Sequence, residues 1–560
     1  MDLTVGDTAG YFSRAAGWKE MRVLERPSYM VYSPLYAVYY GELLRAFSDP
    51  FAATIVHRIL IMAAAAVCIL GVARNLLSGG LAWLVAAWWV ALPVNWAGLY
   101  EVHFFSFALL ALGCWLAGAG TEVWWRALSL GALLCSAAFV RNEFVLSYLL
   151  LGGCFVAYET ICTFRKQQSM RDCFLNVLRL FFPSAVVMVA AIVLFSGNPR
   201  AIEWRHVKEA FERRQRANMV QVYAFSYQQR HPEWTKNAFL DGGELMQRDF
   251  GSANAKWSEA FRANRKAFME HVQWNLSLVP AGLELGLFNA YHGANTPDYF
   301  THESQGIWPL LALLAVAALS IAALILGWKT RSHGELRWRH GLWTAVALAC
   351  CLLPCLVAIV TQRPRPSYIL PMLLAVMVIT GASLMILGRL ISKVSRAAGF
   401  TVAYAPILAL VLVLVIRPET FASRRLLTDY RRIEPYAQLI RNKKRVFCTN
   451  SVYSGELVLY LGGRAEKCPQ PLDFSTVRDW MTNRKTFREA LEHFHVTDLF
   501  LEGMAVRSPD FVEWQSQCLQ DGWRQVAVCS QEGMRWAFYT RGIPSDGDAK
   551  GGEKAVATEP

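Results

Sequence analysis

The chain has 560 residues, of which 54% are hydrophobic, and a mean hydropathy of +0.26. These values exclude an ordinary soluble protein, because the apolar residues also gather in runs of about 20, the length that a helix needs to cross a bilayer. The formal charge is +13. Much of it lies in clusters of lysine and arginine beside the apolar runs, a pattern that indicates how the chain is oriented in a membrane. Because orientation explains the positive charge, we exclude nucleic acid as a partner.

Residues 1–50 form a first segment that is rich in aromatic residues. Within it, residues 8–18 predict an amphipathic helix that lies on the membrane surface. A second helix is predicted to start at Ser33-Pro34, because serine is a good N-cap and proline suits the first helical position. Orientation places this segment outside the cell. No apolar run precedes it, so either the segment is translocated without one or a further helix lies upstream of residue 1, and we favour the second.

Apolar runs then predict about ten transmembrane helices over residues 51–416. They lie near 53–75, 80–99, 104–120, 126–142, 143–163, 178–196, 307–328, 341–361, 368–391 and 399–416. Basic clusters follow the fifth, seventh and ninth runs, at residues 165–171, 329–339 and 389–396. All three fall on one side if the runs alternate in direction, and the positive-inside rule makes that side cytoplasmic. We therefore predict a protein of the bacterial inner membrane.

Two large segments then lie on the periplasmic side. The loop at 197–306 is helical in pattern, and its residues 268–288 predict one amphipathic helix that touches the bilayer. Residues 417–545 predict a small extracytoplasmic α/β domain, and residues 546–560 a disordered tail. Four cysteines in the domain, at 448, 468, 518 and 529, permit two disulfides, and four unpaired thiols are the alternative.

Carboxylates beside the outer face of the helices are candidates for chemistry, because charged groups there usually pair, line a cavity or act on substrate. Asp7 precedes the first aromatic segment and could be a general base for an acceptor hydroxyl. Glu101 and His103 begin the third run and could hold the acceptor or, together with Asp7, a divalent cation. The alternative is that Asp7 and Glu101 only cap helices.

Arginines at the outer face run against the positive-inside bias. The strongest local signal is the loop TQRPRPSYILP, which carries Arg363, Arg365 and Tyr368 and suits a phosphate group. Arg141 could also face a phosphate, or it could pair with Glu143 two residues later. Arg58 lies about one turn inside the first run, where it could join the phosphate site or extend to the membrane surface.

These motifs, in this order, resemble the GT-C superfamily of polyprenyl-phosphate-dependent glycosyltransferases, in particular its bacterial protein mannosyltransferase-like and lipid A aminoarabinose transferase-like members. The motifs that carry the resemblance cover roughly residues 1–420. They are Asp7 with Tyr11, the Ser33–Tyr36 stretch with the later Arg58, Glu101 at the start of a span, and the Arg365–Pro371 element. The sequence departs from the family pattern in its single acidic residue at Asp7 and in Pro366 and Ser367, which interrupt the family's Arg-Tyr pair.

The resemblance implies a reaction and a role for each candidate residue. A sugar on polyprenyl phosphate would pass to a lipid, glycan or protein hydroxyl with inversion, Asp7 being the base and Glu101 a second acidic group. The leaving phosphate would be stabilised by arginines. They are Arg363, Arg365 and either Arg58 or Arg141, with Tyr368 beside them. Tyr11, Tyr36, His103 and Glu143 would contact the acceptor or the rest of the substrate.

Other functions remain open from the sequence. A multi-pass transporter or lipid flippase would have a similar number of spans, but we find neither the internal repeat nor the midplane polar groups typical of transporters. A polysaccharide polymerase or ligase would share the lipid-linked chemistry, and a membrane-anchored sensor or assembly subunit would need no arginines at the outer face. Convergence of Asp7, Glu101 and Arg363 on one cavity would favour the glycosyltransferase.

Overall fold

The computed structural model describes most of the helical part of the chain and part of the C-terminal region. The described ranges are 33–47, 50–92, 101–165, 169–196, 204–234, 241–298, 304–330, 338–416, 447–449, 486–502, 505–507, 509–529 and 536–541, together with single residues and pairs outside them. The chain divides into two compact units. One comprises Met1–Arg22, Ala37–Ile55 and Ala422–Pro560, and the other Val23–Tyr36 and Val56–Phe421.

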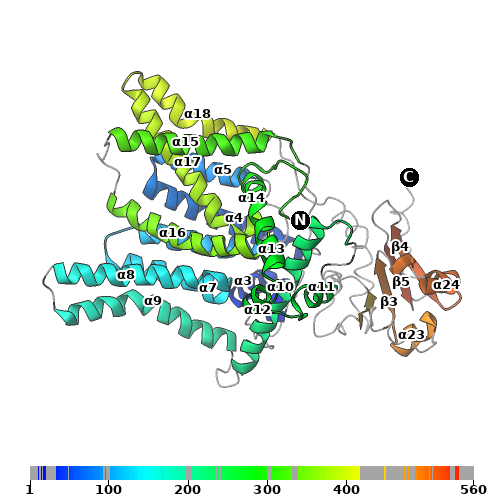
Figure 1. Cartoon of the computed structure of the whole chain (residues 1–560). Helices are drawn as coiled ribbons and strands as arrows, with labels where there is room; N and C mark the ends of the chain where they lie inside the picture. The colour runs from blue at the N-terminus through cyan, green and yellow to red at the C-terminus, as the bar shows by residue number, and fades with distance from the viewer. Residues whose placement is uncertain are drawn as a thin grey trace. The chain divides into compact units, whose positions relative to one another are not determined.

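Apolar helices stand at all ten places where the sequence has an apolar run (Figure 1). They are α4 (Pro50–Leu76), α5 (Gly79–Ala91), α6 (Glu101–Ala117), α7 (Val123–Phe139), α8 (Val145–Arg165), α9 (Met170–Ser196), α15 (Trp308–Thr330), α16 (Trp338–Thr361), α17 (Leu370–Ser392) and α18 (Arg396–Ile416). Six of them, α4, α8, α9, α16, α17 and α18, are long and apolar enough to cross a membrane. The predicted multi-pass helical architecture is thus confirmed, while the total of about ten spans stays a prediction.

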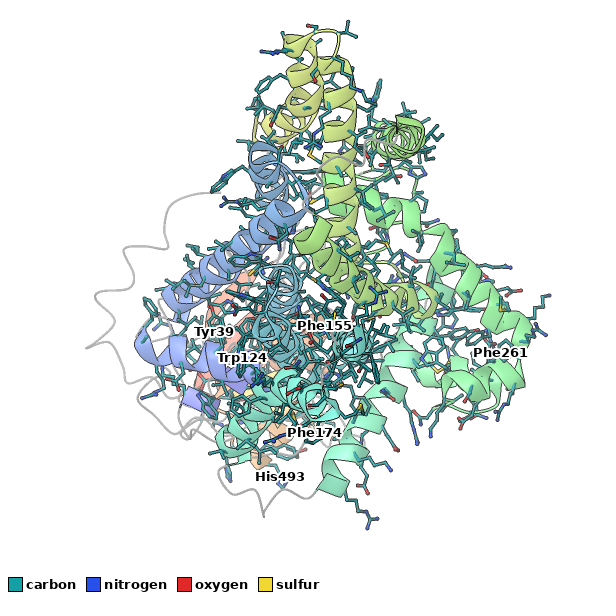
Figure 2. The ribbon with its side chains drawn as sticks, turned by 90° about the vertical axis from the view of Figure 1, so that its left-hand side faces the viewer. Tyr39, Trp124, Phe155, Phe174, Phe261 and His493 are labelled. Atoms are coloured by element: carbon teal, nitrogen blue, oxygen red, sulfur yellow. The ribbon has the colours of Figure 1, made fainter. Side chains whose placement is uncertain are left out.

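The outside of this bundle is apolar. Helices α7, α8 and α9 pack along one another, and Trp124 of α7 and Phe174 of α9 are exposed on their surface (Figure 2). The rings of Trp124 and Phe182 meet edge to face with centroids 6.3 Å apart. Large exposed apolar surfaces are uncommon on soluble monomers, so these faces suit contact with lipid chains.

The long segment after α9 contains five helices in its described residues. They are α10 (Trp204–Arg230), α11 (Gly242–Phe250), α12 (Trp257–Ala263), α13 (Arg265–Ser277) and α14 (Val279–Phe288). A small core holds α10 to α11, with Tyr223 and Met246 among its buried residues, and the Tyr223 hydroxyl donates to Asp249 Oδ2 at 2.6 Å. The single helix predicted over 268–288 is wrong: the chain breaks at Leu278, because Pro280 has no N–H to continue the helical hydrogen bonds.

The described C-terminal residues form a five-stranded sheet in the order β2-β1-β3-β5-β4. The elements are β1 (Phe447–Thr449), β2 (Leu472–Asp473), α23 (Phe487–His493), β3 (Asp498–Glu502), η6 (Ala505–Arg507), α24 (Pro509–Gln517), β4 (Trp523–Cys529) and β5 (Trp536–Arg541). Strand β1 is parallel to both neighbours, and β5 is antiparallel to β3 and β4. Leu499, Leu501 and Tyr539 share a core with Phe511 and Trp514 of α24.

Two of the four cysteines of this region have described side chains. Cys448 and Cys518 are buried, and the two disulfides that the sequence permits stay a prediction. Burial raises the pKa of the Cys518 thiol. Cys468 and the side chain of Cys529 lie outside the described residues.

Helix α3 (Pro34–Ala46) begins at the Ser33-Pro34 pair, as predicted. Ser33 has a φ of 60°, in the left-handed region that non-glycine residues seldom adopt. Its hydroxyl donates to the carbonyl oxygen of Val140 at 2.7 Å. This bond fastens the start of α3 to the break between α7 and α8, where two of the candidate site residues lie.

Candidate functional site

The loop between α16 and α17 is short and buried. Prolines at 364 and 366 restrict its backbone, the Arg365 N–H donates to the Arg363 carbonyl at 2.8 Å, and residues Pro366–Tyr368 form the 3-10 helix η4. Both arginines are buried, which is unusual for arginine unless it is paired. The loop therefore holds two cations in fixed places.

The two arginines have different neighbours. Arg365 Nε lies 3.4 Å from Asp298 Oδ1, and its guanidinium stands over the Tyr368 ring at 5.6 Å from the centroid. Arg363 stands over the ring of Phe225 in α10 at 4.8 Å. The sequence suggested a single phosphate-binding pair, whereas the structure places Arg365 over Tyr368 and Arg363 over Phe225.

Helix α13 supports the loop from the side of α16. The last carbonyls of a helix lack partners within the helix, and here side chains of α13 supply them. His271 Nε2 donates to the Thr361 carbonyl at 3.0 Å, and Asn275 Nδ2 donates to that of Val360 at 3.2 Å. The pKa of His271 is lowered to about 4, chiefly by burial and also by the positive charges of Arg230 and Arg363, while the bond to Thr361 opposes this shift.

Helix α14 touches the loop directly. A Cβ added to Gly282 would overlap the carbonyl oxygen of Pro364, so only glycine allows this close approach of the two backbones. The loop is therefore clamped by α13 at its start and by α14 at its first proline.

The break between α7 and α8 carries a second arginine site. The Arg141 N–H donates to the Ser136 carbonyl at 2.8 Å, and the 3-10 helix η2 (Asn142–Phe144) leads into α8. The guanidinium of Arg141 pairs with Glu143 Oε1 at 2.6 Å. Glu143 stands two residues before the start of α8, where the helix dipole favours a negative charge.

Tyr368 connects these parts. Its ring meets His103 of α6 edge to face, with centroids 5.1 Å apart. The guanidinium of Arg141 lies over the same ring at 5.3 Å. Arg141 comes from the break between α7 and α8, whereas Arg365 comes from the loop between α16 and α17. Cations placed over an aromatic face are attracted by its quadrupole, so one tyrosine orders two arginines and a histidine.

A small pocket opens at this junction. It is lined by His103, Ser106, Phe107, Leu110, Arg141, Glu143, Phe144, Ser367, Tyr368, Leu370 and Pro371. His103 is 8% exposed and Ser367 5% exposed. Neither the ring nitrogens of His103 nor Oγ of Ser367 has a hydrogen-bond partner among the described residues. Buried polar groups almost always have partners, so the pocket suits a polar ligand.

Three arginines act electrostatically on His103: Arg141, Arg365 and Arg214. Arg214 lies on α10, in the charged stretch EWRHVKEAFERRQR of the long loop. Arg214 was not among the predicted site residues, because nothing in that stretch distinguishes one solvated arginine from another. The surroundings of the pocket are cationic, which suits an anionic ligand.

Four residues expected at the phosphate or substrate are not among those that line this pocket: Arg363, Arg365, Arg58 and Tyr36. Arg58 is fully buried, donates from Nη2 to the Asn95 carbonyl and stands over the Phe104 ring at 5.1 Å. Tyr36 is buried between the rings of His57 and Phe105, with centroids 5.4 and 5.5 Å away. Both contacts join the first helices to α6.

The remaining candidates cannot be placed at the pocket. Asp7 lies outside the described residues, and so does the side chain of Glu101, whose backbone begins α6. Tyr11 is buried under the guanidinium of Arg14 at 5.1 Å in the other compact unit. The described residues include no group of three metal-ligating side chains. The roles of Asp7, Glu101 and Tyr11 therefore stay predictions.

Comparison with known proteins gives one structural match to report. No protein-family model matches the chain, and no curated protein matches its sequence. The structure is similar to the archaeal oligosaccharyltransferase AglB from Archaeoglobus fulgidus, in complex with an inhibitory peptide and a dolichol-phosphate. The TM-score is 0.42 and the identity 12%, over 90% of this chain and 66% of that chain.

A TM-score below 0.5 carries no argument about function. The function therefore has to be argued from the side chains of the pocket.

Proposed function

We propose that the chain is a membrane glycosyltransferase that transfers a sugar from polyprenyl phosphate to a hydroxyl group on the periplasmic side. The observation that carries the proposal is the pocket between α6, η2 and η4. It combines apolar walls with buried polar atoms of His103 and Ser367 and with the guanidinium of Arg141. Such a mixture suits the phosphate of an amphiphilic lipid better than a fully solvated metabolite.

The phosphate has a natural place in this pocket. Arginine binds phosphate through two parallel charge-assisted hydrogen bonds, and Arg141 lines the pocket with its guanidinium fixed on Tyr368. Ser367 and His103 would add a hydroxyl and an imidazole, and Arg365 and Arg214 a favourable field. Because these groups are already oriented, they stabilise the charge that grows on the leaving phosphate without a reorganisation cost.

The reaction forms one bond and breaks another. The acceptor hydroxyl oxygen bonds to the anomeric carbon from the face opposite the phosphate, and the anomeric C–O bond breaks with its electrons going to the phosphate. The configuration inverts. The hydroxyl proton passes to a carboxylate, a role that the sequence resemblance gives to Asp7, with Glu101 holding the acceptor or a divalent cation. The polyprenyl chain would lie along the apolar helices, and the acceptor would be a lipid, a glycan or a protein.

Transfer of a radiolabelled sugar from polyprenyl phosphate by the purified protein in lipid nanodiscs tests this proposal. Wild-type protein should release polyprenyl phosphate and label an acceptor in a membrane extract. Arg141→Ala should reduce the rate by about 10²–10³, the usual effect of removing one preorganised donor. Arg205→Ala is the matched control, because Arg205 is 87% exposed. Lipid movement between leaflets with no sugar transfer would instead indicate a flippase.

A further inference from the structure

The ion pair in the pocket joins two side chains of unequal exposure. Arg141 and Glu143 meet at 2.6 Å, with side-chain exposures of 12% and 39%. Arg141 is held in place: its N–H donates to Ser136, Val140 before it is fastened by Ser33, and its guanidinium lies on Tyr368. Glu143 is the partner that can move, because its side chain is more exposed and has fewer contacts that fix it.

We propose that Glu143 is an internal anion that occupies Arg141 until the phosphate of a polyprenyl lipid displaces it. The inference rests on the proposed function, since it concerns the same pocket. Glu143 is the only carboxylate among the described residues that line the pocket. It neutralises Arg141 in the empty pocket, and any phosphate that binds there has to compete with it for the same N–H groups.

The energies favour the exchange. An ion pair between partly exposed side chains contributes little net stability, whereas a bidentate arginine–phosphate pair is among the stronger charge-assisted contacts. The phosphate would also satisfy the buried polar atoms of His103 and Ser367, which Glu143 leaves without hydrogen bonds. Released Glu143 turns to solvent, so no carboxylate is left buried without a partner.

The exchange sets an order of binding. While Glu143 is paired with Arg141, its Oε1 accepts hydrogen bonds from the guanidinium, and an incoming phosphate cannot use the same N–H groups. Once the lipid phosphate holds Arg141, Glu143 stands beside it as a carboxylate that can accept a hydrogen bond from an acceptor hydroxyl. The donor therefore binds first, and the acceptor meets a carboxylate released from Arg141 only when a donor is present.

Binding of polyprenyl monophosphate in nanodiscs tests the exchange without any knowledge of the acceptor. Glu143→Gln should tighten binding by roughly threefold to fivefold, the range that an ion pair of up to about 1 kcal/mol corresponds to. Glu143→Asp keeps the charge but is one methylene shorter and reaches Arg141 less well, so it should also tighten binding. If the negative charge at residue 143 acted only through its electrostatic field, Glu143→Asp would bind the lipid as tightly as the wild type does.

The outcomes separate the two proposals. If wild-type protein binds the lipid and neither variant binds it more tightly, the exchange is refuted and the glycosyltransferase proposal stands. If only Glu143→Gln binds more tightly, the carboxylate acts through its field and the exchange is again refuted. If the wild type and Glu143→Gln both fail to bind the lipid, both proposals fail.

Discussion

Arg141 acts in this account through the shape of its side chain as well as its charge. A guanidinium offers a planar fork of donors, whereas the lysine ammonium is a compact point charge. The Tyr368 ring also orients the guanidinium plane, at 5.3 Å from its centroid. The identity of the residue should therefore matter at constant charge.

We predict that Arg141→Lys loses at least about tenfold in the rate of sugar transfer, because a bidentate contact becomes a single one. The measurement is the initial rate at saturating donor lipid. Arg205→Lys, the same exchange on an exposed arginine of α10, should keep the wild-type rate. Equal rates for Arg141→Lys and wild type would show that the bidentate contact of the guanidinium does not contribute to catalysis.

His271 gives the fold a dependence on pH. Its pKa is lowered to about 4 by burial, then by Arg230 and Arg363, against about 6.5 in an unfolded chain. The imidazole is neutral in the folded protein, so its contribution to the free energy of unfolding is complete above about pH 6.5. That contribution is lost as the pH falls toward 4, at up to about 1.4 kcal/mol per pH unit.

We predict that the melting temperature of the detergent-solubilised wild type falls more steeply between pH 6.5 and 4.5 than that of His271→Gln. Glutamine can still donate to the Thr361 carbonyl but has no proton to gain. Parallel melting curves for the two proteins would show that His271 does not titrate on unfolding.

At the scale of the elements, α14 and the loop after α16 approach each other backbone to backbone. Gly282→Ala should therefore displace the loop that carries Arg365, because the new methyl group would meet the Pro364 carbonyl, which cannot rotate away. We expect sugar transfer to fall at least about tenfold, since misplaced catalytic groups are costly. Gly153→Ala in α8 is the control, as a Cβ there meets nothing within 4 Å, and it should behave as wild type.

Helices α7 and α8 share a buried ion pair between Arg126 and Glu159. Removal of one member leaves the other charge buried, which costs about 3–5 kcal/mol, whereas replacement of both by apolar residues is often neutral. Arg126→Met should thus lower the melting temperature strongly, and the double variant Arg126→Met with Glu159→Met should recover most of the loss. A double variant no more stable than the single one would contradict this explanation.

The elements differ in how far the sequence determines them. The apolar helices could be predicted because a run of about 20 apolar residues has few alternatives, and the start of α3 because Ser33 and Pro34 act locally. The divergence of Arg363 and Arg365 could not be predicted. It depends on Phe225 and Asp298, which are distant in sequence. Arg214 was missed for the same reason, since it reaches His103 only through the packing of the long loop.

For the whole molecule, a pocket on the periplasmic side requires one direction of insertion into the membrane. The basic clusters at 165–171, 329–339 and 389–396 should be cytoplasmic, and the loop after α16 should face outward. In a background without native cysteines, Gln362→Cys should react with a membrane-impermeant maleimide added to intact cells. Ser169→Cys should react only after the membrane is opened. The reverse pattern would place the pocket on the cytoplasmic side and exclude a periplasmic acceptor.

Binding of the lipid phosphate in this pocket is tested most directly by photo-crosslinking. The probe is a polyprenyl phosphate that carries a photoreactive group beside its phosphate. The protein in nanodiscs is irradiated with the probe, digested and mapped by mass spectrometry. We predict cross-links within residues 141–144 and 365–371, and their loss when unlabelled polyprenyl phosphate is in excess. Cross-links confined to the basic clusters, with none at these two segments, would contradict a lipid-phosphate site in this pocket.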